Sequence, residues 1–208
     1  MPMLLNSTHD RALLGIWEIS ESVVFFEEAI DYRSHASNPG KRLQQLASRM
    51  ILDVLQPGFP FSQITLNPAG KPIIETGTTH FSISHTIGFA AAIIASEVPV
   101  GIDIEHISPR VLKVERKFLN EHEFSLLSPF SLPDRIAYAS LFWSIKETVY
   151  KCKGKGGVDI SHDISIISFL QAEKGVAQVK VGKQEGIYPV HYQRVNEVWF
   201  SHMQAIIQ

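Results

Sequence analysis

Residues 89–105 read FAAAIIASEVPVGIDIE, and this stretch decides the class of fold. Its first part, Phe89 to Ala95, is a continuous apolar run of strand length, which predicts a strand buried on both faces. Its last part, Val100 to Glu105, predicts a second strand whose side chains alternate between two faces. The turn residues between them, 97–99, join either the arms of a hairpin or two halves of the protein.

The segments on either side of this stretch show mixed helical and strand periodicity. Helices are expected over residues 22–32, 41–55, 109–118, 120–127 and 133–153. Further strands are expected over residues 13–19, 64–66, 81–84, 164–169, 176–181, 188–192 and 198–207. Helices followed by strands occur twice, so the pattern predicts an α+β fold of two similar halves. The boundaries are residues 1–98 and 99–208.

Composition limits the class of protein. The 208 residues are 45% hydrophobic and 19% charged, which is typical of a globular protein of one large domain or two small ones. A net charge of −2 argues against a protein that binds nucleic acid by neutralising phosphates. The single cysteine, Cys152, excludes an intramolecular disulfide. The apolar stretch from Ile87 to Ala95 is far shorter than the ~20 residues of a membrane span, and no signal peptide is evident, so a cytoplasmic protein is expected.

Asp103 and Glu105 form the first candidate site. They are two residues apart in an expected strand, so both carboxylates lie on one face, with Ile102 and Ile104 on the other. Two carboxylates this close repel one another unless a positive charge lies between them. Mg²⁺, which prefers carboxylate and phosphate oxygens, is the natural partner. The alternative is a solvated polar face on an edge strand.

The expected helix over residues 133–153 carries the second candidate. Trp143, Glu147 and Lys151 are spaced four apart and therefore share one stripe of the helix. An aromatic ring, a carboxylate and an ammonium in one line indicate a binding surface. The alternative is a surface Glu–Lys pair with a tryptophan packed beside it, worth only ~0.3–0.5 kcal/mol.

Other polar groups are more scattered. Ser84 and His85 end an expected strand, and their adjacent side chains point apart, which argues against a Ser–His nucleophile pair. Lys71 lies in a turn, and Arg42 and Arg49 lie on the expected helix over residues 41–55. Asn120 and Glu123 have the spacing of a helix capping box.

These motifs, in this order, resemble the 4′-phosphopantetheinyl transferases of the surfactin-synthetase-activating (Sfp) type. That family carries Gly-Lys-Pro, Phe-Asn-x-Ser-His-Ser/Thr, Gly-x-Asp-x-Glu, a Phe…Glu element and Trp-x-x-Lys-Glu-Ala-x-x-Lys. The corresponding positions here are residues 70–72, 81–86, 101–105, Phe118…Glu123 and 143–151. The resemblance spans roughly residues 40 to 157. Two positions depart from the family pattern: Ser82 replaces Asn and Thr148 replaces Ala.

The resemblance implies an activity and a fold. Such enzymes move the 4′-phosphopantetheine arm of coenzyme A onto a serine of an apo acyl or peptidyl carrier protein, releasing adenosine 3′,5′-bisphosphate. The implied fold is a monomer of two similar α/β halves about a pseudo-twofold axis. Coenzyme A binds in the cleft between them, with its nucleotide on the N-terminal side.

The resemblance also implies roles for individual residues. Asp103, Glu105 and Glu147 bind Mg²⁺ with the pyrophosphate, and Lys151 stabilises or protonates the leaving phosphate. Glu147, directly or through a metal-bound water, takes the proton of the incoming serine, with Glu123 as an alternative base or metal-shell group. The residues expected to bind coenzyme A are Arg42, Lys71, Ser84, His85, Trp143 and Lys151, with Arg49 an alternative to Arg42.

Two other functions use the same residues. One is a Mg²⁺-dependent phosphohydrolase acting on another phosphate ester. The other is a catalytically inactive module that binds coenzyme A or a carrier protein, against which the intact Asp103, Glu105, Glu147 and Lys151 argue. The sequence leaves open which carrier protein is the acceptor and whether acyl-coenzyme A is accepted.

Overall fold

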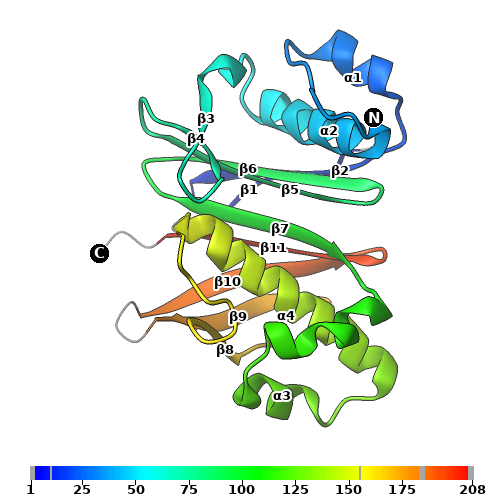
Figure 1. Ribbon diagram of the computed structural model, residues 1–208, viewed down its shortest axis with the longest axis vertical. Helices are drawn as coiled ribbons and strands as arrows, with labels where there is room; N and C mark the ends of the chain where they lie inside the picture. The colour runs from blue at the N-terminus through cyan, green and yellow to red at the C-terminus, as the bar shows by residue number, and fades with distance from the viewer. Residues whose placement is uncertain (1–2, 10, 155, 183–185, 206–208) are drawn as a thin grey trace.

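The structure is a computed structural model that describes residues 3–9, 11–154, 156–182 and 186–205. It contains two main β-sheets, each covered on its outer face by helices (Figure 1). The first sheet has the strand order β1-β2-β6-β5 and the second has the order β7-β11-β10-β9-β8. All pairings in both sheets are antiparallel. The expected mixed α and β fold is therefore confirmed.

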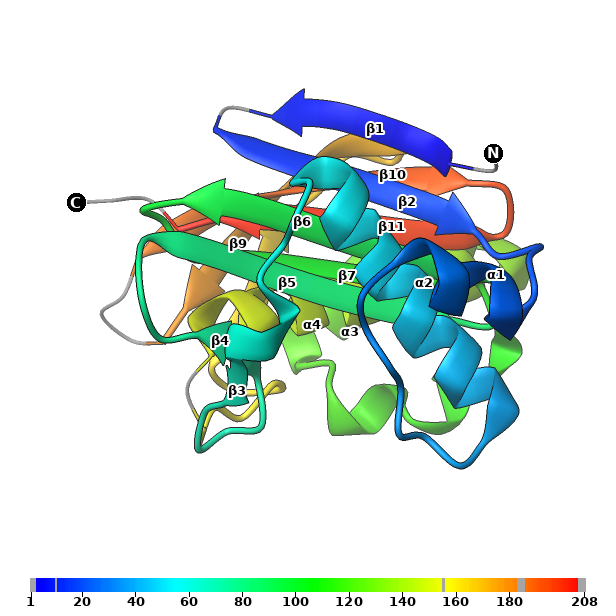
Figure 2. The same cartoon turned by 90° about the horizontal axis from the view of Figure 1, so that it is seen from above.

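The first sheet consists of β1 (Met3–His9), β2 (Ala12–Glu18), β5 (Thr79–Thr86) and β6 (Phe89–Ser96). Helices α1 (Val23–Ala29) and α2 (Pro39–Leu55) lie over its outer face, as the view from above shows (Figure 2). Sequence analysis missed β1, which has little alternation of its own and is held by pairing with β2. Helix α2 starts two residues before the expected residue 41, because Asn38 caps the helix and Pro39 occupies its first turn.

The second sheet consists of β7 (Val100–His106), β8 (Ile164–Ser168), β9 (Lys174–Val181), β10 (Ile187–Val195) and β11 (Val198–Gln204). Helices α3 (Glu121–Leu127) and α4 (Leu132–Lys153) cover its outer face (Figure 1). The strand expected over 198–207 ends at Gln204, and residues 206–207 lie outside the described residues.

The helix expected over residues 109–118 is wrong in type. The structure has two short 3-10 turns there, Pro109–Lys113 and Glu115–Lys117. Val114 separates them with φ −121° and ψ −3°, outside helical geometry. β-branched residues have lower helix propensity, and the segment has two of them, Val111 and Val114, within four positions.

Three hydrophobic clusters correspond to three packed layers. One fills the space between α2 and the first sheet, one lies between the inner faces of the two sheets, and one lies between the second sheet and α4. Strand β6 contributes Phe89, Ala91 and Ile93 to the layer between the sheets, while Ala90, Ala92 and Ile94 face α2. The apolar run therefore forms a strand buried on both faces, and residues 97–99 connect the two sheets.

Edge strands β5 and β7 lie side by side where the two sheets meet, and serine hydroxyls join them. The backbone N–H of Ile102 donates to Ser82 Oγ at 3.3 Å, and the N–H of Ile104 donates to Ser84 Oγ at 3.3 Å. Ser82, which departs from the family pattern, is therefore part of this seam. The seam positions β7 against the end of the first sheet.

Gly101 sets the distance between β7 and α4. A Cβ atom at this position would overlap the carbonyl oxygen of Thr148 and lie 2.8 Å from the backbone nitrogen of Cys152. Thr148, the second departure from the family pattern, donates its hydroxyl to the carbonyl oxygen of Ser201 on β11 at 3.0 Å. The absence of a side chain at 101 thus lets the backbone of α4 approach the sheet closely.

The first prediction concerns this close approach. Gly101→Ala should lower the free energy of unfolding by more than about 2 kcal/mol, because the obstructing atoms belong to a helix backbone that cannot rotate away. Urea unfolding followed by circular dichroism measures the change. Gly156→Ala is the control, since an added Cβ there meets nothing nearer than 3.9 Å. Equal stability of the two variants would contradict the packing argument.

The second prediction concerns His202, which is buried in β11. Burial, together with the nearby charges of His191, His9 and Lys174, lowers its pKa from 6.5 to about 3. Between these values the unfolded chain binds the proton and the folded chain does not, so stability is lost as pH falls. Between pH 7 and pH 5, this residue should lower the free energy of unfolding by about 2 kcal/mol.

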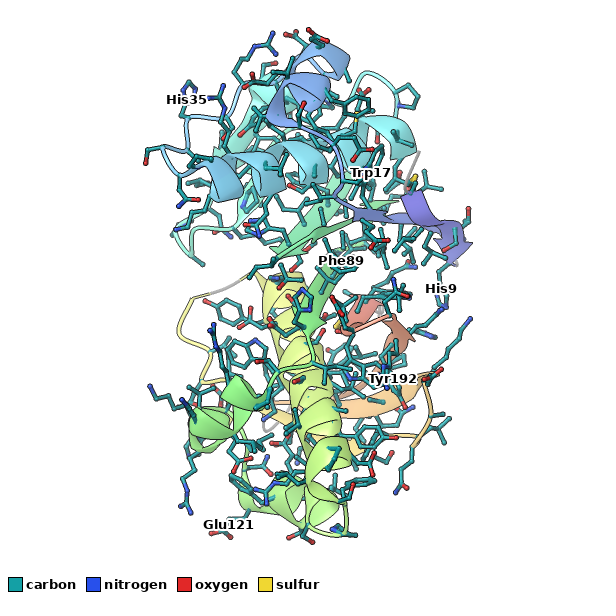
Figure 3. The ribbon with its side chains drawn as sticks, turned by 90° about the vertical axis from the view of Figure 1, so that its right-hand side faces the viewer. His9, Trp17, His35, Phe89, Glu121 and Tyr192 are labelled. Carbon is teal, nitrogen blue, oxygen red and sulfur yellow. The ribbon has the colours of Figure 1, made fainter. Side chains whose placement is uncertain are left out.

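Thermal unfolding at pH 7 and pH 5 tests this sign. His202→Asn should flatten the acid loss of stability, because the asparagine side chain does not titrate. His35→Asn, at an exposed position on the other half of the molecule (Figure 3), should leave the wild-type pH dependence intact. A wild-type protein that is equally stable at both values would refute the assignment.

Candidate active site

The candidate site forms where β5, β7 and α4 meet. Asp103 lies in the middle of β7, paired in register with Ser201 of β11. Ser84 comes from β5, across the seam, and Lys151 comes from the last turn of α4. The three elements are distant in sequence, and the seam and the close approach at Gly101 bring them together.

Asp103, Ser84 and Lys151 are in direct contact. Lys151 Nζ lies 2.6 Å from Asp103 Oδ1 and 3.0 Å from Ser84 Oγ. Ser84 Oγ donates to Asp103 Oδ1 at 2.8 Å. The Asp103 side chain is 6% exposed and that of Lys151 is 25% exposed, so the ammonium reaches solvent while the carboxylate does not. This contact holds one cationic group at a fixed place on the site's surface.

The carboxylates of Glu105 and Glu147 interact electrostatically with Asp103 and Lys151. Burial and then the negative charge of Asp103 raise the pKa of Glu105 to about 7. Burial also raises the pKa of Glu147; Lys151 opposes that rise and Asp103 adds to it. The negative charge of Asp103 thus helps to raise the pKa of both glutamates. The single positive charge of Lys151 does not offset the negative charge of the three carboxylates.

The carboxylates of the cluster are candidate ligands of a divalent cation. Among the residues that the structure describes, no three His, Cys, Asp or Glu side chains are arranged closely enough to hold a metal ion by themselves. Asp103 Oδ2 is nevertheless buried without a hydrogen-bond partner. An acceptor in that state, beside two glutamates of raised pKa, is the environment that a cation relieves. Because Mg²⁺ commonly binds one or two carboxylates plus substrate phosphates, the donor set fits Mg²⁺.

Two cavities flank the cluster. One of about 190 Å³ is lined by Lys71, Pro72, Ser82, Glu147 and Lys151, among others. The other, of about 780 Å³, is lined on the opposite side by residues that include Thr86, Glu105, Arg110 and Trp143. The stripe predicted on α4 therefore divides: Glu147 and Lys151 face the smaller cavity, while Trp143 faces the larger one.

Lys71 reaches the site from the turn between β3 (Ile64–Leu66) and β4 (Pro72–Ile74). Asn67 shapes this turn by accepting the N–H of Lys71 at 2.9 Å, and its side-chain amide donates to Gly154 O at 2.7 Å. The turn is thereby fixed to the end of α4. Burial lowers the pKa of Lys71.

The two arginines of α2 lie in different surroundings. Arg42 forms an ion pair with Glu27 of α1. Arg49 lies 5.1 Å above the ring of Tyr32, and its Nε is buried without a hydrogen-bond partner. Partial burial lowers the pKa of His85, and the positive charges of Lys151 and Arg49 lower it further, which places both cations near this histidine. Arg49 is therefore near the expected site residue His85, whereas Arg42 is paired with Glu27.

Glu123 does not join the cluster. Its side chain is fully buried and forms an ion pair with the equally buried Lys146, with Glu123 Oε2 and Lys146 Nζ 2.7 Å apart. Its oxygens also accept the N–H of Asn120 at 2.9 Å and the N–H of Ile166 at 2.8 Å. The predicted capping box is confirmed. These contacts tie α3, α4 and β8 together, which is a structural role.

Two of these features have little signal in the sequence. Ser84 is expected among the residues that bind coenzyme A, and in the structure its hydroxyl contacts Asp103 and Lys151 inside the cluster. Lys146 lies within the recognised helix motif, and its buried contact with Glu123 depends on a fold that brings α3 against α4. The i and i+4 spacing on the helix revealed only the groups that share one element.

Comparison with known proteins identifies the family of this chain. Residues 99–205, just over half of the chain, match the sequence model of the 4′-phosphopantetheinyl transferase superfamily, and the chain belongs to that superfamily. The match includes β7 and α4, and hence Asp103, Glu105, Glu147 and Lys151.

Several characterised relatives are similar over part of the chain. The 4′-phosphopantetheinyl transferase psf-1 of Bacillus pumilus is 31% identical over 130 residues, which cover 61% of this chain and 54% of the relative. The transferase gsp of Aneurinibacillus migulanus is 34% identical over 124 residues, which cover 60% of this chain and 49% of the relative. Sfp of Bacillus subtilis (strain 168) is 35% identical over 88 residues, which cover 42% of this chain and 39% of the relative. The matches thus span about half the length of these relatives or less.

The third prediction follows from the buried Glu123–Lys146 pair. Lys146→Met should lower the free energy of unfolding by ~3–5 kcal/mol, because it leaves a carboxylate buried without its counter-charge. Adding Glu123→Gln to that variant should recover part of the loss, since the amide is neutral and its oxygen still accepts a hydrogen bond. Urea unfolding of both variants measures the effect. A double variant less stable than the single one would show that the charge is not the cause.

Proposed function

We propose that this chain is a 4′-phosphopantetheinyl transferase that moves the phosphopantetheine arm of coenzyme A onto a serine of an apo carrier protein. The observation that supports it most is the contact of Asp103, Ser84 and Lys151 between two cavities. A carboxylate that we propose to bind a cation lies beside a fixed ammonium, and transfer of a phosphoryl group requires both kinds of group. Membership of the superfamily supports the same activity.

The proposed reaction exchanges the phosphoanhydride linkage of coenzyme A for a phosphoester. The serine oxygen of the carrier forms a bond to the phosphorus that bears the pantetheine arm, and the bond from that phosphorus to the leaving nucleotide phosphate breaks. Glu147 accepts the serine proton. Lys151 donates a proton to the leaving adenosine 3′,5′-bisphosphate, and Asp103 and Ser84 hold its ammonium in place.

Asp103, Glu105 and Glu147 are the proposed ligands of Mg²⁺. When bound, this ion neutralises the diphosphate and the charge that develops during transfer. The chain itself contributes a buried acceptor, Asp103 Oδ2, that has no hydrogen-bond partner.

The nucleotide end is proposed to lie near Lys71, His85 and Arg49. Lys71 lines the smaller cavity, and Arg49 acts electrostatically on His85. A buried guanidinium Nε without a partner supports Arg49 as a ligand of the 3′-phosphate, in place of Arg42. Trp143, in the larger cavity on the other side, is proposed to contact the pantetheine arm.

The remaining expectations are part of the same proposal. Residues 1–98 and 99–208 act as two halves related by a pseudo-twofold axis, each with a sheet and a long outer helix. The protein works as a cytoplasmic monomer with coenzyme A and an acyl or peptidyl carrier protein as partners, and without nucleic acid. Within the described part of the chain, no helix combines the length and apolar character that crossing a bilayer requires.

Intact-mass spectrometry tests the proposed function. A panel of apo carrier proteins is incubated with the protein, coenzyme A and Mg²⁺, and one member should gain the mass of a single phosphopantetheine. Asp103→Asn should abolish this gain while the protein stays folded. Free phosphopantetheine without a modified carrier would indicate a phosphohydrolase. Binding of coenzyme A with no product at all would indicate an inactive module.

The fourth prediction separates Lys151 from the neighbouring positive charge. Lys151→Met should lower kcat by about 100-fold or more and change the Kd for coenzyme A much less, since the leaving phosphate gains charge only as the bond breaks. Lys153→Met is the matched control, because that ammonium lies against the ring of Tyr188 at 4.5 Å. Similar losses in both variants would indicate a diffuse basic surface.

The fifth prediction distinguishes the two arginines. Arg49→Gln should weaken binding of coenzyme A by about 10-fold, the loss expected for one charge-assisted contact. It should leave binding of 3′-dephospho-coenzyme A unchanged. Arg42→Gln should affect neither ligand, because Arg42 is paired with Glu27. Calorimetry measures the dissociation constant of each variant for each of the two ligands. A larger loss of coenzyme A binding in Arg42→Gln than in Arg49→Gln would restore Arg42 to the site.

A further inference from the structure

A second cluster of titratable side chains lies between the two sheets, on the opposite face of the second sheet from α4. It consists of His9 on β1, His191 on β10 and His202 on β11. The ring centroids of His9 and His191 are 4.1 Å apart, those of His9 and His202 are 5.0 Å apart, and those of His191 and His202 are 5.3 Å apart. Figure 3 shows His9 lying beside the strands of the second sheet that carry the other two.

His202 is the buried member of this cluster. It is 6% exposed, and its Nδ1 is buried without a hydrogen-bond partner. It lies on the same face of β11 as Val198 and Phe200, which pack in the layer between the sheets. A polar ring atom left unpaired at this depth is costly unless a ligand completes its bonding.

The three imidazoles line a hollow of about 320 Å³ that lies between β1 and strands β9, β10 and β11. Its other polar lining groups are the hydroxyls of Ser7 and Thr8, the ammonium of Lys174 and the amide of Gln193. Among its described lining residues none is acidic. Among the described residues that line the hollow, every titratable group other than Tyr192 is therefore cationic or becomes cationic on protonation, and the Tyr192 hydroxyl bonds to Leu170 O.

Two observations decide between a metal ion and an anion as the occupant. The rings of His191 and His202 are nearly parallel, with an interplanar angle of 16°, and no described group of three ligating side chains is arranged to hold a metal. The lining supplies hydrogen-bond donors in excess, together with the positive charge of Lys174. Convergent donors without a carboxylate are the chemistry that recognises an oxyanion.

We propose that this hollow, formed by His9, Lys174, His191 and His202, binds a small oxyanion of the phosphate or sulfate type. The site is separate from the Asp103–Lys151 cluster and does not depend on the transferase activity. His202 contributes its unpaired Nδ1, while Lys174 contributes charge at the exposed side of the hollow.

Nuclear magnetic resonance of the imidazole groups, with inorganic phosphate as the probe, tests this site. Phosphate is added to the full chain at pH 7 and constant ionic strength, with chloride as the reference anion. The His202 signals should shift and saturate with phosphate. This readout is local to the hollow, so phosphate bound near Lys151 does not produce it.

Variants at the edge of the hollow complete the test. Lys174→Gln should raise the dissociation constant about 3-fold and His191→Gln about 10-fold, as expected for the loss of a charge and of a charge-assisted hydrogen bond. Lys180→Gln is the matched control, since this exposed lysine of β9 lines a different hollow. His202 signals that do not respond to phosphate, or respond equally in all variants, would overturn the proposal. Saturation by Zn²⁺ but not by phosphate would also overturn it and identify a metal site.

Discussion

The structure depends on the seam between β5 and β7, where two sheets join through side chains instead of a backbone ladder. The hydroxyls of Ser82 and Ser84 accept the N–H groups of Ile102 and Ile104, which would otherwise be unpaired on a buried edge strand. The same Ser84 hydroxyl donates to Asp103 and contacts the ammonium of Lys151. The Ser84 hydroxyl therefore accepts a backbone N–H from the edge strand β7 and also orients the side chains of the candidate site. The two sheets cannot separate without breaking up the site.

Helix α4 is held against this seam from the other side, with little freedom to move. Gly101 lets its backbone approach β7, and Thr148 and Ser144 bind Ser201 of β11 through their hydroxyls. At its middle, Lys146 is fixed by Glu123 and by the carbonyl oxygens of Phe118 and Ile160. These contacts leave Glu147 and Lys151 on a rigid support. Rigidity matters because transfer of a phosphoryl group depends on positioning and on preorganised charge.

The two faces of the second sheet carry opposite electrostatic imbalances. On the face covered by α4, Asp103 and the two glutamates outnumber Lys151, and the pKa values of both glutamates are raised. On the face toward the first sheet, three histidines and Lys174 lie together, and the pKa of His202 is lowered. Each imbalance leaves a buried polar atom unpaired, Asp103 Oδ2 in one case and His202 Nδ1 in the other. A cation fits the first and an anion fits the second.

The sequence by itself determined whatever depends on local order. Periodicity located α4 and β6, the capping box appeared in Asn120 and Glu123, and the spacing of short motifs indicated the superfamily and the carboxylates. Only the tertiary structure decided how distant segments meet. It paired Arg42 with Glu27 and left Arg49 near His85, buried Glu123 against Lys146, and gathered His9, His191 and His202 from three strands. The physical reason is that the periodicity of side chains reflects only the structure of a few neighbouring residues. Strand order and register depend instead on the burial of whole sheet faces, and these are built from several segments that are distant in sequence.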